Sequence, residues 1–327
     1  MCYIVRYLLG GVILKKALTY GIGSAFFFSF TFILNRSMNI SGGSWIWSSS
    51  LRYIFMLPIL FFIVLTKNQL IDVLKSIKNS PIKWILWSTV GFGLFYAPLS
   101  FASEYGASWL VSGTWQITII AGALMSPLFF KYIKTESGIV KVRNKIPKKT
   151  LIISSIILIG IFLMLFGEAK HISFLQSFLV IIPVIIAAFS YPLGNRKMME
   201  FCSENLNTIQ RVFGMTLCSM PFWIILSIYG ISSVGFPSTQ QIFQTFLVAI
   251  FSGVIATILF FKATDIVSKD VHKLAVIEST QSGEVIFTAL GGIFILNDRV
   301  PGVFGVIGIV LVVFGMILNS LSRENSN

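Results

Sequence analysis

The chain has 327 residues, of which 55% are apolar, 14% aromatic and only 11% charged, and its mean hydropathy is +0.86. Soluble domains carry about 25% charged residues, so this composition excludes an ordinary soluble globule, a disordered chain and a disulfide scaffold. The net charge of +13 would suit nucleic-acid binding, but the positions of the basic residues indicate another origin.

Ten apolar stretches follow one another along the chain, most of them near the ~20 residues that cross a bilayer as a helix. Each is expected to be helical, because backbone in hydrocarbon must satisfy its own hydrogen bonds. The expected spans are Ala17–Leu34, Trp45–Thr66, Trp84–Ala102, Ala107–Phe130, Leu151–Gly167, Phe174–Gly194, Thr208–Tyr229, Phe243–Phe261, Leu274–Leu296 and Gly302–Leu321. The sequence therefore predicts an all-α membrane protein with ten transmembrane helices.

Two segments outside the spans carry predictions of their own. Gln69–Lys78 has apolar residues at helical spacing, which favours a short amphipathic helix on the inner surface, with a plain linker as the alternative. Met1–Ile13 precedes a natural beginning near Leu14, and we expect it to be a mis-annotated extension.

The basic residues indicate how the chain is oriented. If the N-terminus is cytoplasmic, the segments on the inner side hold 20 of the 25 Lys and Arg, and the outer loops hold only Arg36, Lys170 and Arg299. Lys and Arg collect in cytoplasmic loops. Both termini are therefore expected in the cytoplasm of a bacterial cell with the protein in its inner membrane, and the positive charge needs no nucleic acid.

The two halves of the chain share a pattern. Short matches recur in the same order at offsets of 159 to 165 residues: Asn35-Arg36 with Asn195-Arg196, Arg52 with Arg211, and Thr114-Trp115-Gln116 with Ser279-Thr280-Gln281. Five helices per unit give the two copies opposite orientations in the membrane. We expect a first repeat over residues 14–167 and a second over residues 168–327, and inverted repeats are typical of transporters.

Acidic residues are almost missing from the spans. Only Glu278 and Glu284 lie inside one, and Glu284 comes ten residues after Leu274, ~15 Å along the helix and so near the midplane. Helical spacing places Gln281 on the same face as both acids. A carboxylate at that depth can bind a proton or a substrate cation, which is the simplest physical basis for antiport.

Two basic residues, Arg52 and Arg211, also lie inside spans. They lead to two further interpretations: static ion pairs with Glu278 and Glu284, or capture of a carboxylate-bearing metabolite. The polar and aromatic side chains that we expect to line a cavity between the repeats are Gln116, Trp115, Tyr96 and Tyr191. Gly302, Gly305 and Gly308 are expected to permit close helix contact.

Several stretches carry a family resemblance: LNDRVPGVFGVIGIVLVVFGMILNS (296–320), GGSWIWSSSLRYIFMLP (42–58), AAFSYPLGNRKMM (187–199) and ESTQSGEVIF (278–287). They resemble the EamA-like ten-helix branch of the drug/metabolite transporter superfamily, and most closely its multidrug resistance efflux transporters. The resemblance implies export of drugs, amino acids or other metabolites. Small four-helix members use a glutamate in their first helix, and Ala17–Leu34 contains no acid, so an equivalent glutamate here would have to be in Leu274–Leu296.

The leading prediction is a secondary transporter that exports small organic, cationic or lipophilic compounds in exchange for protons. The first alternative is an exporter of amino acids or other metabolites that uses Arg52 or Arg211, and a channel or structural membrane protein is a second. No P-loop, paired histidines or nucleophile set occurs at membrane depth, so we expect no enzyme activity, metal or cofactor. The expected partners are the small-molecule substrate, protons and the bilayer, with a homodimer as an open arrangement.

Overall fold

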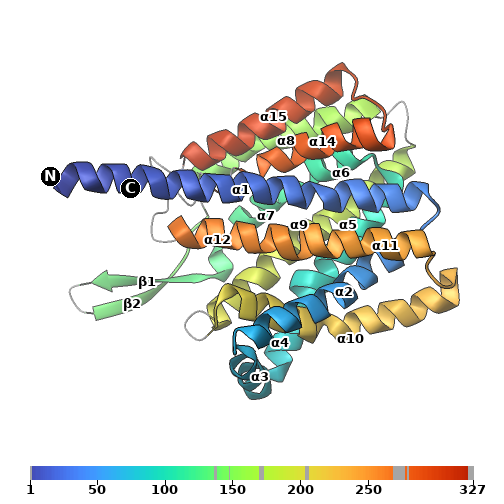
Figure 1. Ribbon diagram of the computed structural model, residues 1–327. Helices are drawn as coiled ribbons and strands as arrows, with labels where there is room; N and C mark the ends of the chain where they lie inside the picture. Colours follow the sequence, from blue (N-terminus) through green and yellow to red (C-terminus); the bar gives the residue numbers. More distant parts are fainter. Residues whose placement is uncertain are drawn as a thin grey trace.

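The computed structural model describes residues 2–135, 138–146, 148–168, 173–202, 206–267, 277 and 280–322. Nearly all of these residues lie in helices that run side by side (Figure 1). The first half contains α1 (Cys2–Ile40), α2 (Trp45–Thr66), α3 (Leu70–Asn79), α4 (Pro81–Ser88), α5 (Leu94–Tyr105), α6 (Ser108–Trp115), α7 (Ile117–Leu124) and α8 (Lys148–Glu168). The second half contains α9 (Phe174–Cys202), α10 (Thr208–Val234), α11 (Thr239–Val248), α12 (Thr257–Val267), α14 (Ser282–Leu296) and α15 (Val303–Ser322).

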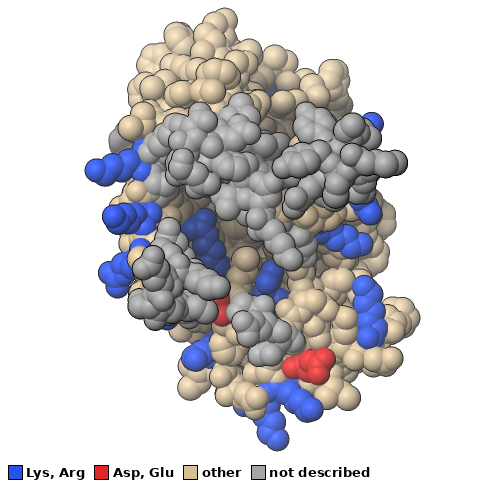
Figure 2. All heavy atoms as spheres, turned by 90° about the vertical axis from the view of Figure 1, so that its left-hand side faces the viewer, with Lys and Arg blue, Asp and Glu red and all other residues tan. Residues whose placement is uncertain are grey.

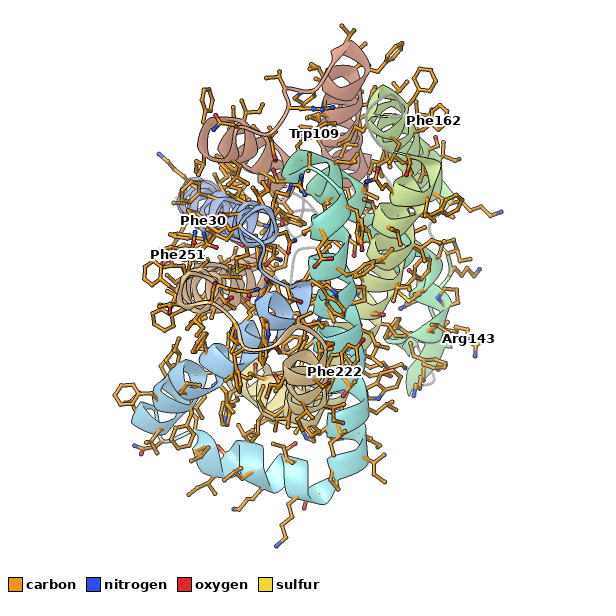
Figure 3. The ribbon with its side chains drawn as sticks, turned by 90° about the vertical axis from the view of Figure 1, so that its right-hand side faces the viewer. Phe30, Trp109, Arg143, Phe162, Phe222 and Phe251 are labelled. Atoms are coloured by element: carbon orange, nitrogen blue, oxygen red, sulfur yellow. The ribbon has the colours of Figure 1, made fainter. Side chains whose placement is uncertain are left out.

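The predicted membrane character is confirmed at the level of whole helices. Six helices are long and apolar enough to cross a bilayer, and shorter apolar helices cover 151–167, 282–296 and 303–318. Large apolar side chains point away from the bundle, as Phe162 does in Figure 3, where 65% of this residue is exposed. An apolar outer surface of this extent is stable against lipid rather than water. The chain is a multi-pass membrane protein.

Helix ends follow local chemistry. The Ser44 side chain accepts a hydrogen bond from the Ile46 amide and starts α2, and Asn207 with Gln210 forms a capping box at the start of α10. At the end of α14, Asn297 adopts the left-handed conformation that stops a helix. Gln69–Lys78 does form a helix, α3, whose Val73 is buried while Ile71 and Leu74 are exposed.

The structure corrects the expected extent of one helix. The stretch Ala107–Phe130 is not one helix, because α6 ends at Trp115, α7 ends at Leu124 and a strand begins at Phe130. At the N-terminal end, α1 begins at Cys2, and the expectation that Met1–Ile13 is a mis-annotated extension stays a prediction.

The all-α prediction missed a hairpin. Strands β1 (Phe130–Thr135) and β2 (Gly138–Arg143) pair antiparallel and project from the bundle beside the beginning of α1 and the end of α15 (Figure 1). We call this the hairpin end of the molecule. The opposite, far end holds the connections α1–α2, α10–α11 and α14–α15.

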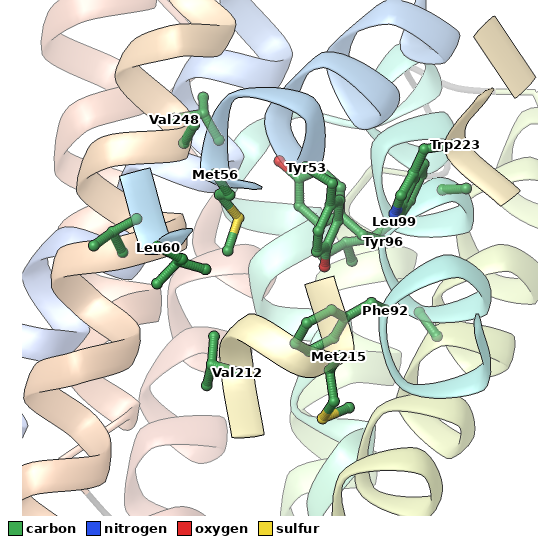
Figure 4. Packing of buried hydrophobic residues seen from close by; sticks show 14 of the residues in the cluster. Tyr53, Met56, Leu60, Phe92, Tyr96, Leu99, Val212, Met215, Trp223 and Val248 are labelled. Carbon is green, nitrogen blue, oxygen red and sulfur yellow. The ribbon is translucent and has the colours of Figure 1, made fainter. Parts of the chain in front are cut away.

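Aromatic residues form the centre of the core. The Tyr53 ring stacks on Trp223 with 4.5 Å between ring centroids, and Phe92 and Tyr96 pack against Tyr53 at 5.2 and 5.8 Å (Figure 4). These rings come from α2, α10, η1 (a π-helical segment, Thr89–Gly93) and α5. The core therefore joins helices from both halves of the chain.

Candidate functional site

A cavity of about 320 Å³ lies in the middle of the bundle. Its walls come from α1, α2, α5, α6 and α7 of the first half and from α9, α10, α12, α14 and α15 of the second. A cavity of this size is within the range that binds small organic ligands. Because both halves contribute to it, a change in their relative position changes the cavity.

Most of the candidate site residues meet at this cavity. The ones that line it are Glu284, Gln281, Arg52, Gln116, Trp115 and Tyr191. Tyr96 lies behind the wall and contacts Arg52, whereas Arg211 packs elsewhere, with its guanidinium 5.4 Å from the centre of the Phe261 ring. Glu278 lies outside the described residues.

Glu284 is a buried acid in the first turn of α14, and only 5% of the residue is exposed. Backbone N–H groups at a helix start favour negative charge, so this position suits a carboxylate. In the described part of the chain, salt bridges join Arg36 to Asp298 and Lys197 to Glu200, and none involves Glu284. Its carboxylate is therefore available to a ligand or a proton in the cavity.

Arg52 is a buried cation, 4% exposed, that is held by neutral groups. One nitrogen donates to the Ser252 hydroxyl at 3.0 Å and another to the Thr31 hydroxyl at 3.4 Å. The guanidinium carbon lies 3.9 Å from the centre of the Tyr96 ring, within the range of a cation–π contact. Among the described residues, no salt bridge joins Arg52 to Glu284.

Three aromatic rings form one wall of the cavity. Phe95 lies 4.6 Å from Tyr191 and 5.1 Å from Trp115, measured between ring centroids, and Trp115 lies 5.7 Å from Tyr191. The three residues belong to α5, α6 and α9. Such a wall binds flat apolar groups, and its π-faces also attract cations.

The local backbone shows the same interruptions in each half. Gln116 lies between α6 and α7, and Gln281 lies directly before α14, so the two glutamines of the predicted repeat both stand at helix breaks facing the cavity. The segments η1 (Thr89–Gly93) and η3 (Ala249–Ala256) are both π-helical, and their first residues are 160 positions apart. π-Helical turns are frequent at functional sites.

The lining continues from the central charges toward the hairpin end. Asn195, Arg196 and Met199 of α9 line it there, and Arg196 donates to the Gly122 carbonyl at 2.8 Å. Figure 2 looks onto this end, where Lys and Arg far outnumber Asp and Glu around a hollow. The cavity is therefore bordered by the basic side chain of Arg196 on the hairpin side.

Sequence reasoning missed several lining residues. Phe95, Thr31, Asn195 and Arg196 all line the cavity, and only Asn195 and Arg196 had a signal, as part of the repeated Asn-Arg pair. Periodicity reports which face of a helix is polar. It does not report which helices meet, and that decides whether Phe95 faces a ligand or lipid.

Comparison with known proteins extends these observations. The protein of Bacillus subtilis (strain 168) named "Uncharacterized protein YjlA" is 49% identical over 309 residues, 94% of this chain and 95% of the relative. A Shouchella clausii protein, described as an uncharacterized 42.1 kDa protein in the intracellular alkaline protease 3' region, is 46% identical over 271 residues, 82% of this chain and 70% of that relative.

A solved crystal structure, described only as that of a protein, superposes with a TM-score of 0.64 over 96% of this chain and 99% of its own. Its sequence identity of 13% shows a shared fold and says nothing about activity.

The family comparison agrees with the resemblance found in the sequence, which is thereby confirmed. A family model described as "Putative multidrug resistance efflux transporter" (EmrE) matches residues 15–325. The chain belongs to this family of the drug/metabolite transporter superfamily.

Proposed function

We propose that the protein is a secondary transporter that exports small organic compounds from a bacterial cell across its inner membrane in exchange for protons. The observation that carries the proposal is Glu284, a buried carboxylate without a salt-bridge partner among the described residues, in a cavity built by both halves. One carboxylate that binds either a proton or a cation couples their movements, because the two compete for the same negative charge.

Charge balance supports this role for Glu284. The guanidinium groups of Arg52 and Arg196 in the cavity lining stay charged at every physiological pH. Relative to the state with Glu284 ionised, protonation of Glu284 and binding of a monovalent cation to its carboxylate each add one positive charge. The protonated cavity and the cation-bound cavity therefore carry the same net charge, as an exchange cycle requires.

The repeated interruptions support alternating access through a five-plus-five inverted repeat of ten helices. Gln116 and Gln281 occupy matching helix breaks, and η1 and η3 occupy matching positions in the third apolar stretch of each half. Two copies of one shape in opposite orientations can exchange conformations around a central site. The basic hairpin end is then the cytoplasmic side, and both termini are cytoplasmic.

The test is efflux of ethidium from energised cells that express the wild type or Glu284→Gln at equal membrane levels. The wild type is expected to lower intracellular ethidium, and a protonophore is expected to abolish this. Glu284→Gln removes the group that takes up the proton, so efflux should fall to the level of cells without the protein. Glu200→Gln is the matched control, because Glu200 is a partly exposed acid paired with Lys197. Full ethidium efflux by Glu284→Gln would overturn the proposed role.

A second candidate follows from the position of Arg52. Since this cation lines the same cavity as the aromatic wall, the cavity also suits a metabolite that carries a carboxylate. Arg211, the other arginine considered for this role, does not line the cavity. If the wild type moves no ethidium while it exports an aromatic carboxylate, the second candidate replaces the first.

A further inference from the structure

A row of small polar residues connects the cavity with the far end. On α14, Glu284, Thr288 and Gly292 follow one another at four-residue spacing and all are buried. On α6, Ser108 and Ser112 are buried, and Gln116 follows at the same spacing directly after the helix. We call these six positions the α6–α14 seam.

Contacts at the far end fix the register of the seam. A Cβ atom at Gly292 would overlap the Ser108 hydroxyl, so these two residues touch. The Ser108 hydroxyl and amide both donate to Asp298, at 2.6 and 3.1 Å. Because α6 runs toward the cavity while α14 runs away from it, this register sets Ser112 near Thr288 and Gln116 near Glu284.

Asp298 closes the far end of the seam. Its second carboxylate oxygen lies 3.8 Å from Arg36, and Arg36 also donates to the carbonyl oxygens of Ser103 and Glu104 at 3.3 and 3.1 Å. The carboxylate thus ties α1 and α6 to the α14–α15 connection, while Arg36 adds α5. Removing Asp298 would release these contacts together.

Thr288 indicates that the seam also exists in another state. The residue is fully buried, and its hydroxyl has no hydrogen-bond partner among the described residues. A buried hydroxyl without a partner is unfavourable, whereas the same group in contact with water is satisfied. Water that entered the seam would give the Thr288 hydroxyl a hydrogen-bond partner, which valine at this position could not use.

We infer that the α6–α14 seam is the route by which Glu284 exchanges protons with the far side of the membrane, and that Asp298 holds this route shut in the present conformation. The inference rests on the proposed function, in which Glu284 carries the coupling proton. Among the described residues, the charged groups that share the cavity lining with Glu284 are Arg52 and Arg196, both on the cavity side of the seam. A seam closed at the far end prevents protons from leaking through while the cavity extends toward the hairpin end.

The first test measures access of water-soluble reagent to the seam. In a chain with Cys2, Cys202 and Cys218 changed to serine, Thr288→Cys is treated in intact cells with the impermeant thiol reagent MTSES. Asp298→Asn should raise its modification rate at least about tenfold, because losing charge-assisted hydrogen bonds shifts the closed population. Asp298→Glu, which keeps the charge, should restore slow modification.

Thr114→Cys is the matched control. Thr114, on α6, is likewise fully buried, and its hydroxyl has no hydrogen-bond partner in the described part of the chain, but it lies about 200° around the helix from Ser112. Its modification should stay slow in both backgrounds. If Asp298→Asn changes the rates at Thr288→Cys and Thr114→Cys equally, or changes neither, the seam is not the route and the inference is overturned.

The second test uses valine, which keeps the shape of threonine without its hydroxyl. Thr288→Val should slow ethidium efflux driven by a pH gradient about tenfold, because an apolar seam hydrates poorly, and leave ethidium binding to purified protein unchanged. Thr114→Val should leave both unchanged.

The two proposals fail in different ways. A wild type without proton-driven efflux overturns the proposed function. A coupled wild type in which Thr288→Val behaves like Thr114→Val overturns the seam alone.

Discussion

Arg52 and Arg211 both lie inside predicted spans and were equal candidates for binding a carboxylate, but they occupy different positions in the structure. Arg52 lines the cavity, while Arg211 does not, although both lie four residues before a buried methionine. A carboxylate in the cavity can therefore contact Arg52 directly, and we predict that Arg211 contributes less to its binding. The distinction leads to a test with matched variants.

We expect Arg52→Gln to weaken binding of an aromatic carboxylate, such as 3-phenylpropionate, about tenfold or more, because charged hydrogen bonds contribute about 1.5–3 kcal/mol. Arg211→Gln should leave the affinity unchanged. Quenching of tryptophan fluorescence can report binding, since Trp115 lines the cavity. A larger loss with Arg211→Gln would show that the carboxylate binds elsewhere.

At the residue scale, the sequence identified candidate site residues where a charged side chain lies in an apolar span, because burying a charge is costly. Glu284 and Arg52 could be selected because a charge inside an apolar span needs a protein or water environment, and both line the cavity. Tyr96 and Phe95 show the limit, since a ring in a membrane helix can serve packing, lipid contact or a site equally well. Tyr96 lies behind Arg52, while Phe95 lies in the wall.

At the scale of helices, the three glycines that we expected to permit close helix contact have different surroundings. A Cβ at Gly308 would lie 2.5 Å from the Gly160 carbonyl oxygen, and one at Gly160 would lie 2.7 Å from the Gly308 oxygen. Gly305 faces Pro301 and Trp109, and Gly302 has nothing within 4 Å. The predicted close contact is confirmed at Gly308, between α8 and α15, and is wrong at Gly302.

Gly308→Ala should therefore push α15 away from α8 and lower the stability of the protein by about 1–3 kcal/mol, the usual effect of overpacking. Gly302→Ala is the control at the start of the same helix and should change little, because open space surrounds the new methyl group. Thermal unfolding of the detergent-purified variants measures both. Equal unfolding temperatures for the two variants would contradict the tight α8–α15 contact.

Element boundaries were predictable where a cap or an interfacial tryptophan marks them. The span predicted from the sequence at Trp45–Thr66 has the same first and last residues as α2. The break at Gln116 and the π-helical segments were not predictable, because hydropathy stays high across them while the backbone hydrogen bonding changes. The hairpin formed by β1 and β2 was missed because its sequence is typical of a basic loop. The residues of the two paired strands do not alternate strongly between apolar and polar.

At the scale of the whole molecule, the predicted inverted repeat would place equivalent contacts at the two ends, and the described contacts of two matching arginines differ. Arg36 at the far end and Arg196 toward the hairpin end occupy matching positions of the repeat. Arg36 meets the carboxylate of Asp298 at 3.8 Å, while Arg196 donates to the Gly122 carbonyl and stands beside the Phe129 ring.

The orientation of the molecule gives the last prediction. Ser41 and Ser233 are exposed at the far end, and Lys75 is exposed on α3, which lies between α2 and α4 on the other side. From the positive-inside rule we expect the far end to face outside the cell. In a chain without native cysteines, Ser41→Cys and Ser233→Cys should react with an impermeant maleimide in intact cells, and Lys75→Cys only after lysis. Labelling of Lys75→Cys in intact cells would reverse the membrane orientation, and with it the direction in which the closed seam opens.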